Sequence, residues 1–300
     1  MNPFEILKNR IFILALVGLT ALVMGYVFYK PKKEKEPVEL FEFPGHIPRT
    51  VDSEEQVRNG VPLVIYETWH SRHLPKGMAE NIYRLLKTNP EFDFYLYSDE
   101  DCAKFIKDNF EGDVLEAFNM LRPGAFKSDL WRYCMLYKRG GIYLDIKYYS
   151  IVPLVSLIDE NQTIFVRDTT APRTTEGCFY NGFIVSPPNN EIFGKCISDI
   201  VVSTKNKLYK RNVLDITGPC MLGRILTKEY TKKYYSTAKF DYSNLNGNFW
   251  NYHPGISYKG KIILKHYSKY RDEQKKTESD ITYGKLYMKG KVYNSNHLPS

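Results

Sequence analysis

Between residues 61 and 97, segments with the apolar pattern of a strand alternate with a segment that has the apolar spacing of a helix. Val61–Tyr66 is a short apolar run rich in β-branched residues, which predicts a buried strand. Met78–Lys87 has apolar residues at helical spacing, and Phe92–Tyr97 alternates as a second strand does. Ser98, followed three residues later by Asp101, predicts an N-capped helix after that strand.

The predicted order of strand, helix, strand and helix indicates an α/β domain with a parallel sheet covered by helices. Sheets of this kind bind ligands beyond the carboxyl ends of their strands. Trp69 and Asp99 each come just after a predicted strand, so both are candidate nucleotide-binding residues. An ordinary turn position is the competing interpretation for each of them.

The N-terminal region has a different pattern. Residues 11–29 form an uncharged apolar stretch long enough to cross a membrane as a helix, and lysines rather than a cleavage site follow it. We therefore predict an N-terminal tail at 1–10 and an uncleaved transmembrane signal anchor at 11–29. Residues 30–58, rich in Pro, Lys and Glu, are predicted as a stem, and 59–300 as the catalytic domain.

The orientation of this single-pass anchor stays open at the sequence level. Basic residues are more frequent just after the apolar stretch than just before it, which favours a cytoplasmic C-terminal side. A catalytic domain in a Golgi-type lumen would require the opposite arrangement.

The most informative segment begins with a predicted helix at Phe126–Lys138. Asp129 and Arg132 are three residues apart and therefore neighbours on one face of that helix. The pair Gly140 and Gly141 ends the helix, because glycine adopts the left-handed C-cap conformation without a steric penalty.

A short buried strand, Ile142–Ile146, follows the two glycines, and Asp145 lies near its end. A buried carboxylate is unfavourable unless it is paired, hydrogen-bonded or bound to a metal ion. A divalent cation between Asp145 and a diphosphate is one solution. Capping of the following turn, or a pair with Arg132, is the alternative.

Together these segments resemble the DXD-containing glycosyltransferases of the yeast-type α-mannosyltransferase and capsular polysaccharide kind. This group is glycosyltransferase family 32-like and shares a core with the clostridial glucosylating toxins. The match covers roughly Val61–Tyr149 and thins beyond it. It consists, in order, of Glu67-Thr68-Trp69, Asn89-Pro90, Ser128-Asp129-Leu130-Trp131-Arg132-Tyr133, Gly140-Gly141-Ile142-Tyr143-Leu144-Asp145-Ile146-Lys147, and later Asn181-Gly182-Phe183 and Thr217-Gly218-Pro219.

The resemblance implies a GT-A fold, that is, a Rossmann-like nucleotide-diphospho-sugar transferase domain. It also implies a UDP- or GDP-sugar donor, a glycan, glycolipid or glycoprotein acceptor, and transfer of a hexose with retention of configuration. By motif position Trp69 stacks near the base, Asp129 and Arg132 hold the donor sugar, and Asp145 touches ribose and metal. The complete predicted nucleotide-sugar site is Trp69, Asp99, Asp129, Arg132, Tyr143, Asp145 and Asn181.

One position departs from the family pattern. The second acid of the motif is replaced by Lys147, whose ammonium repels a divalent cation. Lys147 can instead neutralise the diphosphate leaving group directly, which makes it a catalytic candidate beside Asp129, Arg132 and Asp145. Alternatively, Mn²⁺ or Mg²⁺ is held by Asp145 together with another residue, for which His266 is the candidate. Loss of activity, leaving a membrane-tethered sugar-nucleotide or glycan-binding protein, is the third alternative.

Composition and the absence of other motifs argue against several other functional classes of protein. The net charge of +8 comes from dispersed lysines, with no recognition helix or zinc finger, so we predict no nucleic-acid partner. The five cysteines are scattered, form no C-x-x-C pair and are predicted to be buried thiols. Neither a G-x-G-x-x-G fingerprint, a P-loop nor a G-x-S-x-G elbow is present.

Overall fold

A computed structural model of the chain describes the residues from Val38 onward, apart from several internal segments and the C-terminal end. The described ranges are 38–51, 54–160, 163–168, 177–229, 236–241, 255–277 and 282–294. The residues from Val38 onward form one compact unit.

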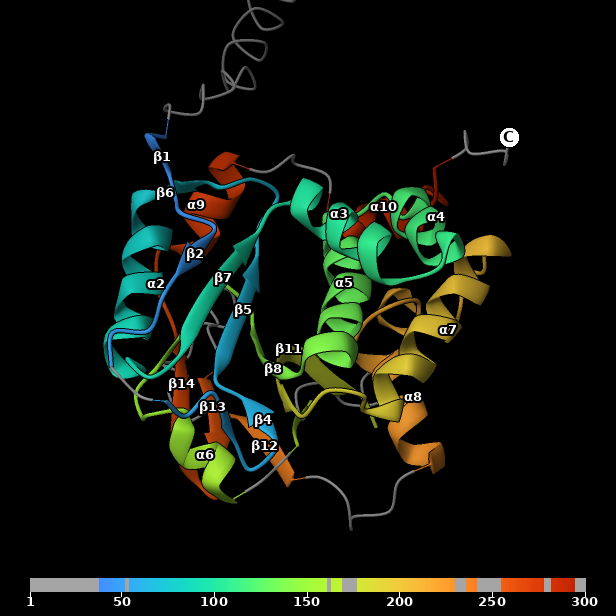
Figure 1. The fold of residues 1–300 in the computed structure, drawn as a ribbon. Coiled ribbons are helices and arrows are strands. Elements are labelled where there is room, and N and C mark those ends of the chain that lie inside the picture. The colour runs from blue at the N-terminus through green and yellow to red at the C-terminus, as the bar shows by residue number, and fades with distance from the viewer. Residues whose placement is uncertain are drawn as a thin grey trace, which may run out of the picture. The chain divides into compact units, whose positions relative to one another are not determined.

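The centre of this unit is a ten-stranded mixed sheet with the strand order β2-β7-β5-β8-β11-β10-β12-β13-β14-β9 (Figure 1). Its strands are β2 (His46–Ile47), β5 (Val64–Thr68), β7 (Asp93–Tyr97), β8 (Gly141–Leu144), β9 (Tyr148–Ser150), β10 (Ile164–Arg167), β11 (Phe179–Ser186), β12 (Ser236–Asp241), β13 (Gly255–Tyr258) and β14 (Lys261–His266). Two small ribbons pair β1 (Leu40–Glu42) with β6 (His73–Pro75), and β3 (Val57–Arg58) with β4 (Val61–Pro62).

Helices cover both faces of the sheet (Figure 1). The core on one face includes residues of α2 (Lys76–Thr88), α6 (Val155–Glu160) and α9 (Tyr270–Thr277). On the other face the core is built with α3 (Asp99–Asn109), α4 (Gly112–Met120), α5 (Gly124–Arg139), α7 (Glu191–Lys205), α8 (Pro219–Glu229) and α10 (Tyr283–Met288). A short 3-10 helix, η1 (Val213–Asp215), precedes α8. The central strands are therefore buried on both sides, as their apolar sequences require.

The prediction of an α/β fold is confirmed, and the predicted cap of α3 and the predicted end of α5 are both present. The Ser98 hydroxyl accepts from the backbone N–H of Asp101, and the Asp101 carboxylate accepts from that of Ser98, a complete capping box for α3. Helix α5 ends at Gly140, whose φ of 64° lies in the left-handed region, as does the φ of 97° at Gly141. A Cβ at Gly140 would also overlap the backbone of Pro188, so a side chain is excluded there.

The prediction of a parallel sheet holds only for its centre. Strands β7, β5 and β8 are parallel, but β11 is antiparallel to β8, and the only further parallel pair is β10 with β12 among the described strands. The reason is that β11 follows β10 directly and folds back along it, a connection that the helical crossover pattern of the first half does not predict.

Only part of the N-terminal region for which we made predictions belongs to the described residues. The predicted tail at 1–10 and anchor at 11–29 lie outside them, and no described helix is both long and apolar enough to span a membrane. Within the predicted stem of 30–58, β2 pairs with β7, and Phe43 is buried in the core. The folded unit therefore includes residues before the predicted start at residue 59.

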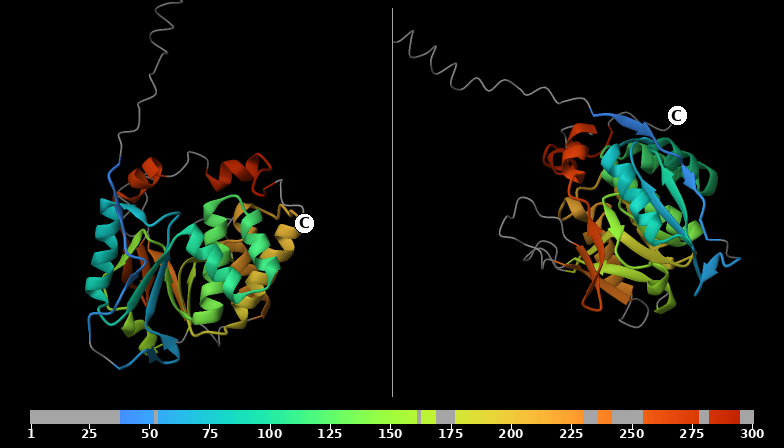
Figure 2. Two further views of the ribbon diagram at one scale, coloured as in Figure 1. Left: turned by 45° about the horizontal axis from the view of Figure 1, so that its top comes forward. Right: turned by 90° about the vertical axis from the view of Figure 1, so that its left-hand side faces the viewer.

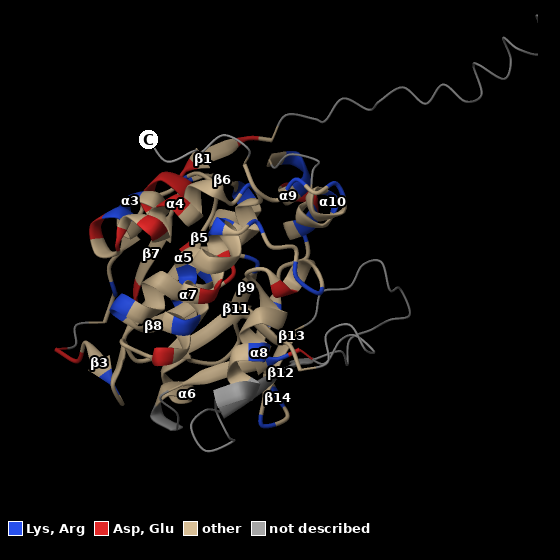
Figure 3. Cartoon of the chain, turned by 90° about the vertical axis from the view of Figure 1, so that its right-hand side faces the viewer, with Lys and Arg blue, Asp and Glu red and all other residues tan. Residues whose placement is uncertain are grey.

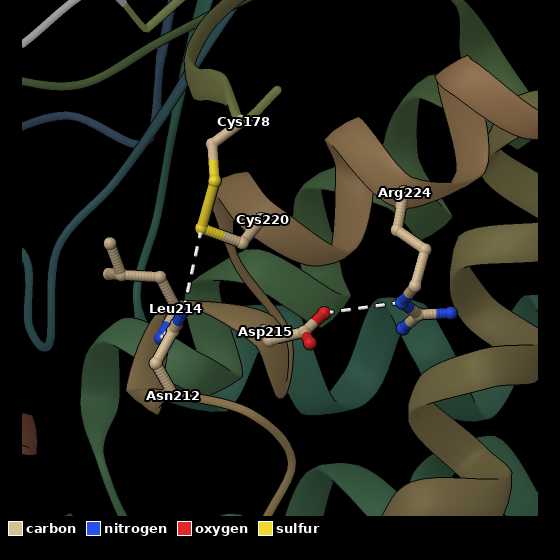
Figure 4. The surroundings of a disulfide bond; sticks show 6 residues. All are labelled: Cys178, Asn212, Leu214, Asp215, Cys220 and Arg224. Carbon is tan, nitrogen blue, oxygen red and sulfur yellow. Dashed lines mark hydrogen bonds and ion pairs between the residues drawn. A yellow bond between two sulfur atoms is a disulfide. The ribbon is translucent and has the colours of Figure 1, made fainter. Parts of the chain in front are cut away.

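Two cysteines form a disulfide instead of the predicted buried thiols. Cys178, just before β11, is bonded to Cys220 at the start of α8, 42 residues along the chain (Figure 4). The prediction was wrong here because only the tertiary structure brings α8 against β11. A Cβ at Gly223 would collide with the backbone of Gly177, so glycine permits this close approach. Three further cysteines are free and buried: Cys102, Cys134 and Cys196.

We expect reduction of this disulfide to lower the free energy of unfolding by about 2–4 kcal/mol, because the bond restricts the unfolded chain. Denaturant titration with and without reductant measures the effect. The double variant Cys178→Ser/Cys220→Ser is the control, since its unfolding should not respond to the reductant. Equal stability of the oxidised and reduced protein would contradict the prediction.

Candidate active site

The candidate site lies where the parallel strands end. Strands β5, β7 and β8 run in the same direction, so their carboxyl ends share one edge of the sheet. Asp145 is the first residue after β8, and its backbone N–H donates to the carbonyl of Gly182 on β11, 2.8 Å away. The antiparallel strand β11 thereby closes one side of the site.

A buried layer of the site joins α5 to β11. The side-chain amide of Asn181 donates to Asp129 Oδ1 at 2.9 Å, and the hydroxyl of Thr217 donates to Asp129 Oδ2 at 2.8 Å. Arg132 Nη2 lies 3.2 Å from Asp129 Oδ1, while its Nη1 donates to the backbone carbonyl of Asn181 at 2.6 Å. The side chains of Asp129 and Arg132 are 11% and 6% exposed, so this pair is largely closed off from solvent.

A more exposed layer surrounds the carboxylate of Asp145. Lys147 Nζ and the hydroxyl of Tyr180 donate to Asp145 Oδ2 at 2.7 and 2.6 Å. The hydroxyl of Tyr143 donates to Oδ1 at 3.0 Å, and Arg132 Nη1 lies 3.5 Å from the same oxygen. The side chains of Asp145 and Lys147 keep 20% and 17% of their surface exposed, so a ligand can reach them more readily than the layer beneath.

Arg132 connects the two layers. Its guanidinium lies 4.1 Å from the ring centroid of Tyr143, and its Nη2 donates to the hydroxyl of Ser128 at 2.9 Å. Gly182 makes room for this arrangement, because a Cβ there would overlap the Asp145 carboxylate and the Tyr180 hydroxyl. The glycine in the Asn181-Gly182-Phe183 segment of β11 is therefore required for steric reasons.

The two carboxylates have opposite electrostatic environments. Burial raises the pKa of Asp129, and the charge of Arg132 offsets this only in part. Burial also acts to raise the pKa of Asp145, but the charges of Lys147 and Arg132 outweigh it and hold that pKa well below its ordinary value. Asp145 is consequently a permanent anion held between two cations.

The groups around Asp145 are not suited to bind a divalent cation. Both oxygens of Asp145 already accept hydrogen bonds, and two of the groups around them, Lys147 and Arg132, are cations. The ring nitrogen Nδ1 of His266 lies 2.8 Å from the carbonyl of Tyr267, and its ring packs against Tyr148. Among the described residues, no three His, Cys, Asp or Glu side chains come together as metal ligands. The predicted site on Asp145 and His266 thus gains no support.

The other predicted nucleotide-binding residues flank the site instead of joining its hydrogen-bond network. Trp69 follows β5, is buried, and packs its ring at 6.4 Å from that of Tyr270 on α9. Asp99 is the first residue of α3, where burial raises its pKa, offset by Lys127 and His70. Their contacts with a nucleotide stay predictions.

Basic residues lie near this end of the molecule. Figure 2 shows α9 and α10 at one end of the sheet, and the colouring of Figure 3 marks Lys and Arg positions along both helices. These include Arg271, Lys275, Lys276 and Lys285. Because α9 also carries Asp272 and Glu273, the two helices together have a small positive charge of four basic minus two acidic residues. This charge favours the approach of an anionic ligand only weakly.

Several residues of the network were not predicted as site residues from the sequence. Ser128, Tyr180 and Thr217 each hold a predicted residue in place, and Tyr133 accepts from Asn181 at 2.9 Å. Ser128 and Thr217 belong to quoted motifs, so the family pattern could have indicated them. Tyr180 had no signal of its own, because its function depends on the pairing of β11 with β8.

Glu67 is the most unusual of the residues that the sequence reasoning missed. It lies on β5, is fully buried, and neither carboxylate oxygen has a hydrogen-bond partner among the described residues. Burial, with the nearby negative charge of Asp145, raises its pKa well above the ordinary value. Glu67 therefore holds its proton more tightly in the folded protein than in the unfolded chain.

We expect the raised pKa of Glu67 to make the protein less stable as the pH rises. The unfolded chain releases the proton near its ordinary pKa of 4.5, whereas the folded chain retains it. The free energy of unfolding should therefore fall by up to about 1.4 kcal/mol per pH unit between pH 4.5 and the raised pKa. Glu67→Gln should remove this slope, because the amide is neutral in both states.

Denaturant unfolding of the wild type and Glu67→Gln across this pH range measures the difference. The exposed Glu80 on α2 provides the matched control, since Glu80→Gln should leave the slope unchanged. Parallel pH curves for wild type and Glu67→Gln would show that Glu67 is charged in the folded state.

The fold and the site define an α/β protein with an anion held between cations beyond the ends of its parallel strands. Comparison with known families places it more closely: residues 75–164 match the family described as "Glycosyltransferase sugar-binding region containing DXD motif". The chain is 27% identical over 169 residues to an uncharacterized glycosyltransferase of Acanthamoeba polyphaga mimivirus. It is 24% identical over 209 residues to inositol phosphoceramide mannosyltransferase 2 of Schizosaccharomyces pombe. The resemblance to DXD-type glycosyltransferases is thereby confirmed.

These matches are partial. The match to the viral relative covers 52% of this chain and 66% of the relative. The match to the yeast relative covers 66% of this chain and 58% of the relative. The chain therefore spans less than two thirds of the length of each. Among solved structures, the PaToxG glycosyltransferase aligns with 56% of this chain and 70% of its own, at 18% identity and a TM-score of 0.43.

Proposed function

We propose that this protein is a glycosyltransferase with a GT-A domain that moves a hexose from a nucleoside-diphosphate sugar to a glycan, glycolipid or glycoprotein acceptor. The observation that carries the proposal is the position of Asp145, Lys147 and Arg132 within the matched sugar-binding region, at the ligand-binding edge of the sheet. In this proposal the diphosphate and ribose lie against the exposed layer of the site, and Asp129 and Arg132 hold the donor sugar.

The charges of the site suit the chemistry of sugar transfer. The bond between the anomeric carbon and the diphosphate oxygen breaks, and its electron pair stays on that oxygen. The acceptor oxygen bonds to the anomeric carbon, and the acceptor's proton passes to the released diphosphate. Fixed cations that face the leaving group stabilise the negative charge that develops there. The anion of Asp145 holds Lys147 in this position, because Lys147 Nζ donates to its Oδ2.

The relatives make mannose the first donor sugar to test. Several of them are mannosyltransferases by name, including those that act on inositol phosphoceramide and the initiation-specific alpha-1,6-mannosyltransferase of Candida albicans. Retention of configuration and a UDP- or GDP-sugar donor belong to the same proposal.

The test is release of nucleotide by the full-length chain from a panel of UDP- and GDP-sugars, with and without simple glycan and glycolipid acceptors. Release from one donor supports a transferase. Binding of a donor without release under any condition would support the inactive, tethered binding protein instead. Failure to bind any sugar nucleotide in calorimetry would overturn both.

We also propose that the predicted anchor at 11–29 tethers the catalytic domain on the lumenal side of a membrane. The disulfide between Cys178 and Cys220 supports this side, because disulfides persist in oxidising compartments and are rare in the cytosol. Protection of the domain from protease in intact vesicles tests the orientation. Digestion without detergent would place the domain in the cytoplasm.

A further inference from the structure

The D-x-D motif named in the family's description is altered in this chain at its second acidic position. Asp145 is present, but Lys147 stands two residues later, where a D-x-D motif that begins at Asp145 has its second aspartate. The structure directs this lysine into the site: its Nζ donates to Asp145 Oδ2 at 2.7 Å, and only 17% of its side chain is exposed. The substitution therefore places a cation directly beside the remaining carboxylate.

Several contacts hold Lys147 in this position. Its Nζ lies 5.4 and 5.3 Å from the ring centroids of Tyr148 and Tyr180, within the range of cation–π attraction. The backbone carbonyl of Lys147 accepts from the N–H of Tyr267 at 3.0 Å, which anchors the main chain to the segment after β14. The hydroxyl of Tyr180 donates to the same oxygen of Asp145 as Lys147 does. Lys147 is consequently an oriented part of the site.

The charges around Asp145 are already balanced without a metal ion. Two carboxylates, Asp145 and Asp129, face two cations, Lys147 and Arg132, within 3.5 Å. A divalent cation at Asp145 would have to displace Lys147 and would be repelled by both basic groups. A diphosphate, in contrast, adds the negative charge that Lys147 can accept, and an ammonium is an effective phosphate ligand.

We propose that Lys147, held by Asp145, Tyr148 and Tyr180, takes the part of the divalent cation, so that this chain binds the diphosphate of its donor without a metal ion. This inference rests on the proposed function. In the transfer step, Lys147 donates a hydrogen bond to the diphosphate oxygen that retains the electron pair of the broken glycosidic bond. No metal ion is needed to balance that charge.

Calorimetric binding of UDP and GDP to the full-length chain, in EDTA and in Mn²⁺, tests the inference. The wild type should bind one of these nucleotides with an affinity that differs less than about two-fold between the two conditions. Lys147→Met should weaken binding at least ten-fold in both, because the loss of one phosphate-facing charge typically has an effect of this size. Lys147→Asp, which restores the D-x-D pattern, should bind only when Mn²⁺ is present.

The matched control is Lys265→Met, since Lys265 lies exposed on β14, and its binding should equal that of the wild type. Thermal unfolding establishes that each variant is folded, and Lys147→Arg, which keeps the charge, should retain binding in EDTA. Wild-type binding that disappears in EDTA and returns with Mn²⁺ would overturn the inference while leaving the proposed function in place. Absence of nucleotide binding under every condition would overturn the proposed function and the inference together.

Discussion

Asp145→Asn should reduce sugar transfer at least about 100-fold, the effect typical of removing a group that stabilises charge in the transition state. The amide has the same shape but no charge, so it holds Lys147 more weakly against the diphosphate. Because a fifth of this side chain is exposed, the domain should still fold. Initial rates of nucleotide release from the active donor measure the loss, and circular dichroism checks the fold.

Asp108→Asn is the matched control, because Asp108 lies on the exposed surface of α3 and pairs only with Lys104 among the described contacts. Its transfer rate should equal that of the wild type. Full activity of Asp145→Asn would remove Asp145 from the catalytic machinery and with it the basis of the proposed function.

Arg132→Met should lower the free energy of unfolding by about 3–5 kcal/mol, the typical effect of removing one partner from a buried ion pair. Methionine fills much of the same volume, so the main loss is electrostatic. Without the guanidinium, the carboxylate of Asp129 stays buried without its cationic partner, and the carbonyl of Asn181 loses a donor. Urea unfolding at neutral pH measures the change.

Lys104→Met is the comparison, since Lys104 forms a helical ion pair that is exposed to solvent and screened by it. Its unfolding curve should nearly coincide with that of the wild type. If Arg132→Met were as stable as Lys104→Met, the buried layer would not depend on the ion pair for its stability.

Local structure followed from the sequence because its causes lie within a few residues. The capping box of Ser98 and Asp101 depends on groups three positions apart, and the end of α5 depends on the freedom of Gly140 to take a positive φ. The spacing of Asp129 and Arg132 likewise fixes their proximity on one helix face. The sequence therefore determined helices α2, α3 and α5, the parallel centre of the sheet and the residues that carry the site's charge.

Only the tertiary structure decided how those charges are arranged. Tyr180 donates to Asp145, 35 residues away in the sequence, because β11 pairs with β8. Thr217 donates to Asp129, 88 residues away, because the segment before α8 lies against α5. The disulfide between Cys178 and Cys220 has the same origin. The sequence likewise left open whether Lys147 neutralises the diphosphate, stands beside a metal ion held by Asp145 and another residue, or marks a lost activity. Packing between Tyr148 and Tyr180 directs it to Asp145, since partners distant along the chain become neighbours only when the sheet is complete.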